Sequence, residues 1–106
     1  MIAQLSLIYT TFSSEADAIK VTRELLEKRL IACVNVFGNM KSICFWKGNL
    51  EESQEVAVFL KTTTENIPAV ITMLEDLHPY ELPVILEIPV RFGAEPFSKW
   101  IQDSVR

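Results

Sequence analysis

The sequence predicts an α+β fold whose elements follow the order β-α-β-β-α-β, with a short helix at the end. Three observations predict it. Two segments, one after Ser14 and one from Ile67, carry apolar residues at helical spacing. Four other segments are rich in β-branched residues or alternate between apolar and polar side chains. Gly48-Asn49 is a hairpin signal between the two middle segments. We expect the 106 residues, 1–106, to form a single domain.

The first expected strand covers residues 3–12 and has a period of two. Its apolar side carries Ala3, Leu5, Leu7 and Tyr9, while Ile8 interrupts the polar side, which indicates that the second face is partly buried as well. The helix that follows should be capped by Ser14, because a serine oxygen can accept a free backbone N–H at a helix start. The apolar stripe of this helix contains Ala18, Ile19, Thr22, Leu25 and Leu26.

Two strands should form the middle of the chain. Residues 30–37 are apolar and predict a buried strand, Gly38-Asn39 indicates a turn or a bulge, and residues 40–47 continue the strand. Residues 51–55 begin the returning strand as an acidic, exposed stretch. Beyond it the strand alternates, and its two faces carry Val56, Val58 and Leu60 on one side and Ala57 and Phe59 on the other.

The second helix has the clearest stripe, and Pro79 should end it at Leu77 or His78, because a proline disfavours helical dihedrals in the residue before it. Pro83 should open the next strand, over 84–90, and Pro89 suggests that this strand lies at an edge or carries a bulge. A terminal helix is expected from Pro96. The stripes of the second and terminal helices contain Ile67, Val70, Ile71, Leu74 and Leu77, and Phe97, Trp100, Ile101 and Val105.

This order predicts the ferredoxin-like arrangement, an antiparallel sheet with both long helices on one face. The other face would then be open in an isolated chain, although apolar residues such as Phe45, Trp46 and Phe59 occur on both strand faces. Exposed apolar patches of this kind mark interfaces. We therefore expect a homo-oligomer with its sheets turned inward.

Composition excludes several classes of partner. The net charge of −4 argues against a nucleic-acid or anionic-membrane surface. The RNA-recognition fold shares this strand order, but residues 55–59 lack its basic and aromatic pattern. No apolar run approaches the ~20 residues that span a bilayer, and residues 1–6 show no secretory leader. We expect a cytoplasmic protein in which Cys33 and Cys44 are reduced.

The residues that could carry chemistry are few. His78, the single histidine, could ligate a metal or move a proton, but a histidine that stabilises the helix C-terminus is the simpler interpretation. Cys33 and Cys44 fall on different predicted strands, and Cys33 suits the role of a small buried hydrophobe. A thiolate with an imidazole would suit copper or zinc, including across a subunit boundary. The carboxylates that could join His78 are Glu81 and Glu87.

Motifs along nearly the whole chain resemble the CutA family of divalent-cation tolerance proteins. They are Arg29-Leu30-Ile31-Ala32-Cys33-Val34-Asn35, Ser42-Ile43, Trp46-Lys47-Gly48, Glu55-Val56, Leu60-Lys61-Thr62, His78-Pro79-Tyr80-Glu81, Pro83, Pro89-Val90 and Trp100-Ile101.

The resemblance implies a ferredoxin-like subunit in a homotrimer similar to the P-II signalling proteins, with a role in tolerance to copper and other divalent cations. It implies no enzymatic reaction. It also implies a cleft between subunits near Cys33, Trp46, Lys61, His78, Tyr80 and Glu81. This chain departs from the family at Cys44, where an aromatic is usual, and at Thr10-Thr11, where some members have a cysteine.

These residues support three functional hypotheses. The first is a trimeric metal-binding protein in which His78 contacts the ion, with Glu81, Cys33 or Cys44. The second is a P-II-like sensor that binds a small anionic ligand between subunits. The residues expected there are Lys61 and Arg91 for charge and Trp46 or Tyr80 for stacking. The third is a hydrolase of the acylphosphatase type, which residues 10–14 disfavour because they contain no arginine.

Overall fold

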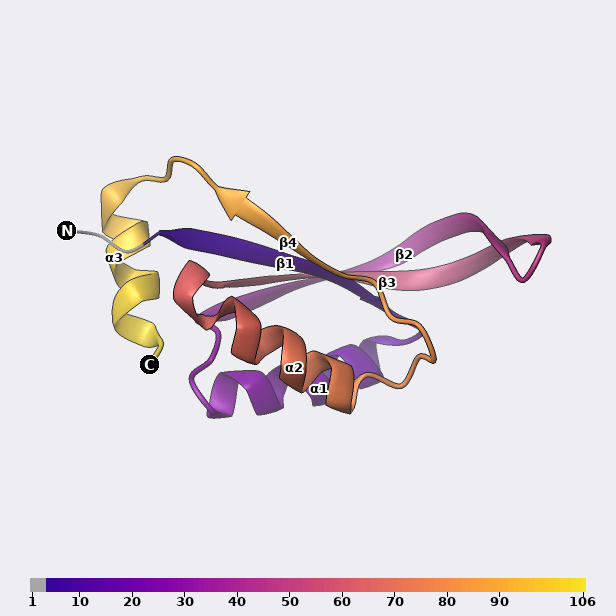
Figure 1. The fold of residues 1–106 in the computed structure, drawn as a ribbon, viewed down its shortest axis with the longest axis horizontal. Coiled ribbons are helices and arrows are strands. Elements are labelled where there is room, and N and C mark those ends of the chain that lie inside the picture. Colours follow the sequence, from indigo (N-terminus) through magenta and orange to yellow (C-terminus); the bar gives the residue numbers. More distant parts are fainter. Residues whose placement is uncertain (1–3) are drawn as a thin grey trace.

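The computed structural model describes residues 4–106, so Ala3 of the expected first strand lies outside the described residues. Its elements confirm the expected order β-α-β-β-α-β with a short helix at the end (Figure 1). They are β1 (Leu5–Phe12), α1 (Glu15–Glu27), β2 (Cys33–Trp46), β3 (Asn49–Thr63), a 3-10 turn η1 (Thr64–Asn66), α2 (Ile67–Leu77), β4 (Ile85–Val90) and α3 (Glu95–Ser104).

The four strands form one antiparallel sheet in the order β2-β3-β1-β4. Both α1 and α2 lie on the same face of this sheet, as expected for the ferredoxin-like arrangement (Figure 1). The β2–β3 hairpin extends well past the two helices, so its far half projects from the body of the molecule. β4 forms an edge, which explains why Pro89 is tolerated within it.

The core lies between the sheet and the two helices. Val56, Val58 and Leu60 of β3 belong to it, as their alternation predicted. In β1, however, the residues that face the helices include Ser6, Ile8, Thr10 and Phe12, all fully buried. The polar side of the β1 pattern is therefore the covered side, because β1 is a central strand whose inner face is buried whatever its polarity.

β2 is one long strand that begins at Cys33 instead of residue 30, and its pairing with β3 shifts between Phe37 and Met40. The Gly38-Asn39 signal therefore marks a bulge. The strand is half exposed and not buried as expected, because it is the outer strand of the sheet. Since β2 is continuous, Cys33 and Cys44 lie on the same strand, which corrects their assignment to different strands.

The hairpin turn is Lys47–Gly48, one residue earlier than expected, because Asn49 already pairs with Trp46. Both turn residues have positive φ, 53° and 84°. Positive φ at both central residues is the mark of a two-residue type I′ turn, whose twist matches that of the flanking strands. The Gly48-Asn49 signal thus predicted the right kind of connection, shifted by one position.

The helices agree with the expected boundaries. Ser14 caps α1, accepting a hydrogen bond from the backbone of Asp17, and α2 ends at Leu77. The buried stripe of α1 differs in one respect, since Ile19 is exposed and Val21 is buried. The helix turns by a fixed angle per residue, and Val21 shares the face of Ala18, Thr22 and Leu25, whereas Ile19 does not.

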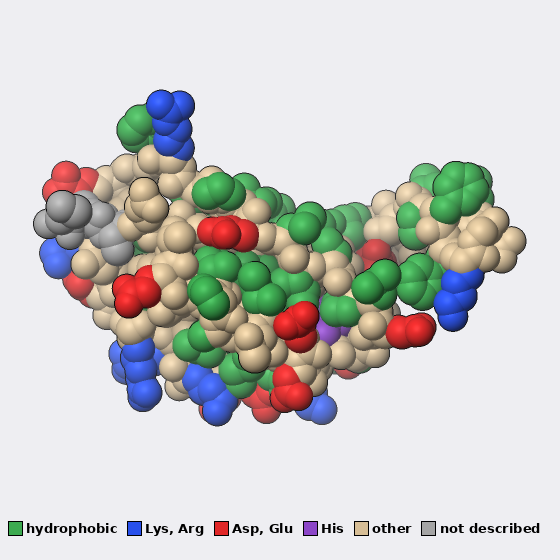
Figure 2. Space-filling model, viewed as in Figure 1, with side chains coloured by type: hydrophobic (Ala, Val, Ile, Leu, Met, Phe, Trp, Pro, Cys, Tyr) green, Lys and Arg blue, Asp and Glu red, His purple; other side chains and the backbone are tan. Residues whose placement is uncertain are grey.

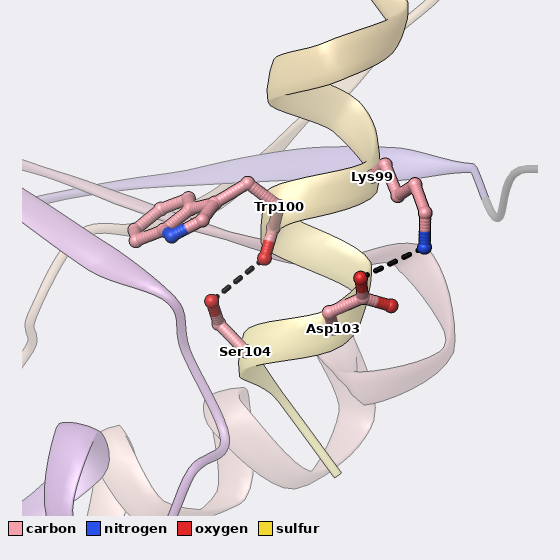
Figure 3. A network of polar contacts seen from close by, with 4 residues as sticks. All are labelled: Lys99, Trp100, Asp103 and Ser104. Carbon is pink, nitrogen blue, oxygen red and sulfur yellow. Dashed lines mark hydrogen bonds and ion pairs between the residues drawn. The ribbon is translucent and has the colours of Figure 1, made fainter.

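α3 packs at the end of the sheet near the start of β1 (Figure 1). Of its expected apolar stripe only Ile101 is deeply buried, while Phe97 and Trp100 remain about half exposed. Figure 3 shows the indole of Trp100 and the Lys99–Asp103 ion pair (2.9 Å) on opposite sides of the helix. The carbonyl of Trp100 also accepts a hydrogen bond from Ser104 Oγ (2.6 Å).

The sheet face opposite α1 and α2 is apolar and open in the single chain. Phe37, Leu86 and Ile88 are each exposed by 42–56% on it, and hydrophobic side chains gather along the body and at the hairpin end (Figure 2). Monomeric proteins rarely leave so much contiguous apolar surface in water.

Within residues 4–106, no helix has the length and apolar character needed to cross a membrane.

Candidate functional site

A cavity of about 640 Å³ lies where the projecting hairpin meets the corner between α2 and β4. We call it the Trp46 cavity, after one of the aromatic residues that line it. One wall is the open-face side of the hairpin, and the other is the segment 79–84. Its lining is mixed, with two aromatic rings, three carboxylates and one thiol. The lining residues are Thr11, Ser42, Cys44, Trp46, Glu51, Ser53, Glu55, Pro79, Tyr80, Glu81, Leu82 and Val84.

The corner begins where α2 stops. His78 has extended backbone dihedrals (φ −69°, ψ 132°), as a residue before proline prefers, and its N–H still reaches the carbonyl of Leu74 at 2.8 Å. Pro79 then directs the chain away from the helix axis. Tyr80 and Glu81 are thereby presented to the hairpin.

His78 anchors this corner to the sheet. The imidazole is 7% exposed and stacks on Phe12 with 4.3 Å between ring centroids. Nε2 lies 2.7 Å from the carbonyl oxygen of Thr11, and Nδ1 accepts the backbone N–H of Tyr80 at 3.1 Å. Both ring nitrogens are therefore engaged within the chain. These contacts differ from the expected role of a protonated imidazole that stabilises the C-terminus of the helix.

The protonation state of His78 depends on these contacts. Burial lowers its pKa below the ordinary value of 6.5, and it outweighs the Thr11 carbonyl and the negative charges of Glu55 and Asp17, which favour the proton. The imidazole is therefore neutral at pH 7. A metal ion could reach one of its nitrogens only after a hydrogen bond is broken, and the role of His78 as a metal ligand stays a prediction.

Glu55 is the centre of a hydrogen-bond network that joins three strands to the corner. Its Oε2 accepts bonds from the hydroxyls of Tyr80 (2.7 Å) and Thr11 (3.0 Å), and Ser42 donates a further bond to the carboxylate. Burial by itself raises the pKa of Glu55, but these donors and nearby His78 outweigh it and hold the pKa below 4.5. The carboxylate is therefore ionised and committed to its donors at neutral pH.

Tyr80 is the counterpart of Glu55 in this network. Burial and its bond to Glu55 raise the pKa of the phenol far above the ordinary value of 10, so it remains a donor throughout the accessible pH range. Its ring also lies 4.9 Å from that of His78. The corner is thus fixed at two points, through the backbone of Tyr80 to His78 and through its hydroxyl to Glu55.

The thiol of this cavity belongs to Cys44, which is exposed and faces Glu51 directly across the β2–β3 pair. Glu81 approaches from the corner and forms a long ion pair with Lys47 at 3.8 Å. Both partners of this pair are more than two-thirds exposed, and exposed pairs of this kind contribute little stability. Glu51 and Glu81 are therefore available to a ligand.

Cys33 and Lys61 lie elsewhere. They face one another near the start of β2, and Lys61 Nζ is 5.5 Å from the ring centroid of Phe97. Eleven residues of strand separate Cys33 from Cys44, which is roughly 35 Å at about 3.3 Å per residue. The structure thus brings Cys44, Trp46, Tyr80 and Glu81 together in one chain and leaves Cys33 and Lys61 at the other end.

Within one chain, the residues that we expected to bind an anion lie at separate places. Arg91 lines a separate hollow beside Phe92 and Gly93, while Trp46 and Tyr80 line the cavity. Among residues 4–106, no lysine or arginine lines the cavity itself, whereas Glu51, Glu55 and Glu81 do. The electrostatic character of this site in the single chain favours a cation over an anion.

Sequence reasoning missed Glu55 and Thr11 as residues of the site. The local pattern places Glu55 at the end of an acidic, solvated stretch, and it marks Thr11 only as a strand residue. The period of two along each strand could have found them. It places Glu55 on the same face of β3 as Ala57 and Phe59, and Thr11 on the same face of β1 as Tyr9. These two faces form one side of the sheet.

One chain does not provide a complete metal site. Within residues 4–106, no three side chains among His, Cys, Asp and Glu converge closely enough to hold an ion. The cavity offers Cys44, Glu51 and Glu81 as dispersed donors on its rim.

Comparison with protein-family models gives one match. Residues 6–104 match the family described as CutA1 divalent ion tolerance protein. This range covers every strand and helix of the structure except the first residue of β1.

Curated relatives agree with this match. The divalent-cation tolerance protein CutA of Thermotoga maritima is 40% identical over 99 residues, which are 93% of this chain and 97% of the relative. The protein CutA homolog of Xenopus laevis is 38% identical over 101 residues, 95% of this chain and 67% of the relative. The chain spans only 55% of the protein CutA of Homo sapiens, to which it is 36% identical.

Solved structures share the fold closely. The divalent ion tolerance protein CutA1 of Ehrlichia chaffeensis superposes with a TM-score of 0.94 at 33% identity, over 98% of this chain and 97% of that one. The periplasmic divalent cation tolerance protein CutA of Archaeoglobus fulgidus gives 0.92 at 36% identity, over 96% and 99%.

Proposed function

The chain belongs to the CutA1 divalent ion tolerance protein family, and we propose that it is a homotrimer that binds divalent cations, copper among them, at the edge of the Trp46 cavity. The role proposed is binding and response to the ion, without catalysis. We also propose a cytoplasmic location, where thiols such as Cys33 and Cys44 stay reduced.

The open sheet face supports the trimer. Tyr9, Phe37 and Phe59 form an aromatic cluster on it, with ring centroids 5.5 and 5.8 Å apart. Leu86 and Ile88 of the neighbouring edge strand extend the same surface. Apolar area that leaves water contributes about 25 cal/mol per Å², so covering this face with further copies of the chain would stabilise the assembly.

The single observation that carries the cation site is the position of Cys44. It is an exposed, soft donor inside a cavity whose other charged lining residues are the carboxylates Glu51, Glu55 and Glu81. Thiolate ligands suit copper and zinc, zinc also accepts carboxylate oxygens, and the thiolate disfavours magnesium. Because one chain supplies too few convergent donors, the proposal requires a neighbouring chain to complete the coordination.

Titration calorimetry on reduced, tag-free and metal-free protein tests the proposal. We expect copper or zinc to bind, magnesium to bind far more weakly, and Cys44→Ser to weaken the copper or zinc affinity at least about tenfold.

Cys33→Ser is the matched control, because it removes a thiol from the same strand at the far end from the cavity. If Cys44→Ser binds copper and zinc as tightly as the unaltered chain, the assigned site is wrong. If neither ion binds to any form of the trimer, the binding function itself is wrong.

A further inference from the structure

The hydrogen bonds of His78 define which nitrogen carries its proton. The backbone N–H of Tyr80 donates to Nδ1 at 3.1 Å, so Nδ1 has a free lone pair and no hydrogen. Nε2 must then carry the proton, and it donates to the carbonyl of Thr11 at 2.7 Å. The geometry therefore admits one neutral tautomer.

A second proton on His78 is incompatible with this geometry. Protonation at Nδ1 would place an N–H against the N–H of Tyr80, since an imidazolium has two donors and no acceptor. The imidazole cannot rotate to avoid this contact, because it is stacked on Phe12 and enclosed, with 7% of its surface exposed. The backbone of Tyr80 must therefore move away.

The charges around His78 come from two elements, β3 and α1. Glu55 of β3 and Asp17 of α1 favour the proton, and burial opposes it. Lys20 and Glu24 of α1 line the adjacent hollow beside Leu77 and Pro79, and their charges have opposite signs. Burial prevails over the two carboxylates, so the pKa of the imidazole lies below its ordinary value of 6.5.

Movement at Tyr80 would reshape the cavity. Tyr80 is part of the corner wall, and its hydroxyl bond to Glu55 fixes that wall to β3. The next residue, Glu81, is paired with Lys47 beside Trp46 at the end of the hairpin. A shift of the corner would therefore strain the Tyr80–Glu55 bond and move Glu81 relative to the hairpin end.

We propose that His78 is a proton-operated latch: its neutral form holds the 79–84 corner against β1 and β3, and its protonation releases that corner and opens the Trp46 cavity. The latch regulates the cavity to which we assign cation binding, and in that respect it rests on the proposed function. It is a property of the metal-free chain, however, and can be tested whether or not cations bind there.

The chain suits a direct experiment because it has one histidine and two tryptophans. In a Trp100→Phe background, Trp46 is the single tryptophan, and acrylamide quenching reports its exposure. Nuclear magnetic resonance of the single imidazole gives the ionisation of His78 in the same metal-free sample. We expect the quenching of Trp46 to rise about twofold as the pH falls from 7 to 5. The midpoint of this rise should coincide with the midpoint of the His78 titration.

His78→Gln is the matched control, because a glutamine amide can accept from the Tyr80 N–H and donate to the Thr11 carbonyl but does not titrate in this range. We expect the pH response of Trp46 to disappear in it. Tyr80→Phe keeps His78 and breaks the bond to Glu55, and we expect Trp46 to be more exposed already at pH 7.

Two results would overturn the latch. One is a His78 titration that leaves Trp46 quenching unchanged, and the other is a pH response that persists in His78→Gln. If His78→Gln does not fold, the Tyr80→Phe variant decides, since an unchanged Trp46 exposure at pH 7 contradicts the coupling. A failure of cation binding would leave these outcomes unaffected.

Discussion

At the residue scale, the corner between α2 and β4 depends on a few polar groups that the sequence pattern did not reveal. Glu55 accepts hydrogen bonds from Tyr80, Thr11 and Ser42, although it lies next to an acidic, exposed stretch. His78 could be recognised from its place before Pro79, because that dipeptide ends a helix. Its hydrogen bonds to Thr11 and Tyr80 depend on tertiary contacts that no local pattern encodes.

Removing the phenol of Tyr80 should destabilise the protein. Tyr80→Phe removes one charge-assisted donor from a partly buried carboxylate, and we expect a loss of about 1 kcal/mol in the free energy of unfolding. Urea denaturation at one fixed protein concentration measures it. Tyr9→Phe is the control, because the Tyr9 hydroxyl makes only a 3.8 Å contact with Met40 Sδ. Equal losses in the two variants would contradict the role given to Glu55.

Stability should fall in two steps as the pH is lowered. The pKa of His78 in the folded chain lies below 6.5, so on acidification the unfolded chain binds this proton at a higher pH than the folded chain does. The stability that neutral His78 contributes above pH 6.5 is therefore lost as the pH falls toward the folded pKa. Glu55 has a folded pKa below 4.5, so its contribution is present above that value and is lost as the pH falls through its folded pKa. Urea midpoints from pH 8 to 3 test this, with His78→Gln expected to lack the first step. A midpoint that rises on acidification from pH 7 to 5 would show that the sign for His78 is wrong.

Thr10 offers a stabilising substitution. Its side chain is fully buried, and Oγ1 has no hydrogen-bond partner within the described chain. Thr10→Val keeps the shape and removes the unsatisfied hydroxyl, so we expect a gain of about 1 kcal/mol in thermal or urea unfolding. Thr62→Val is the matched control, because Thr62 Oγ1 donates to the carbonyl of Leu30 at 2.6 Å, and we expect it to lose stability. A loss in both variants would indicate that Thr10 has a partner.

At the element scale, periodicity predicted the helices well and the strands less well. Ser14 and the proline after His78 determined where α1 begins and α2 ends, because caps and prolines act through the local backbone. The inner face of β1 was not predictable, since a central strand has one face covered whatever its polarity. The continuity of β2 through its bulge depends on pairing with β3, so local patterns assigned the two cysteines to separate strands.

The type I′ turn at Lys47–Gly48 is sensitive to a single methyl group through its backbone conformation. A Cβ on Gly48 would meet no atom within 4 Å, so the cost of Gly48→Ala comes from the positive φ of 84° alone. We expect a loss of about 1 kcal/mol by urea denaturation, and a smaller one for Gly48→Asn, because asparagine tolerates this conformation. If alanine and asparagine are equally tolerated, the turn differs from the one described.

At the scale of the whole molecule, the open apolar face and the incomplete donor set both favour an assembly of several chains. The sequence predicted that a face would remain uncovered, because both sides of the strands are apolar while the two helices cover one side. It could not predict that Cys33 and Lys61 would lie far from the cavity, since strand length and register separate them. The dispersed donors of one chain and its exposed sheet both support our proposal that further copies of the chain complete the site.

Native mass spectrometry of the protein loaded with copper or zinc is the sharpest test of a metal site shared between chains, because one spectrum reports both the number of chains and the number of ions. We expect a species of three chains that retains bound ions, and a dissociated single chain that retains none. A protein that remains a single chain at micromolar concentration, or a single chain that keeps its ion, would contradict the shared site.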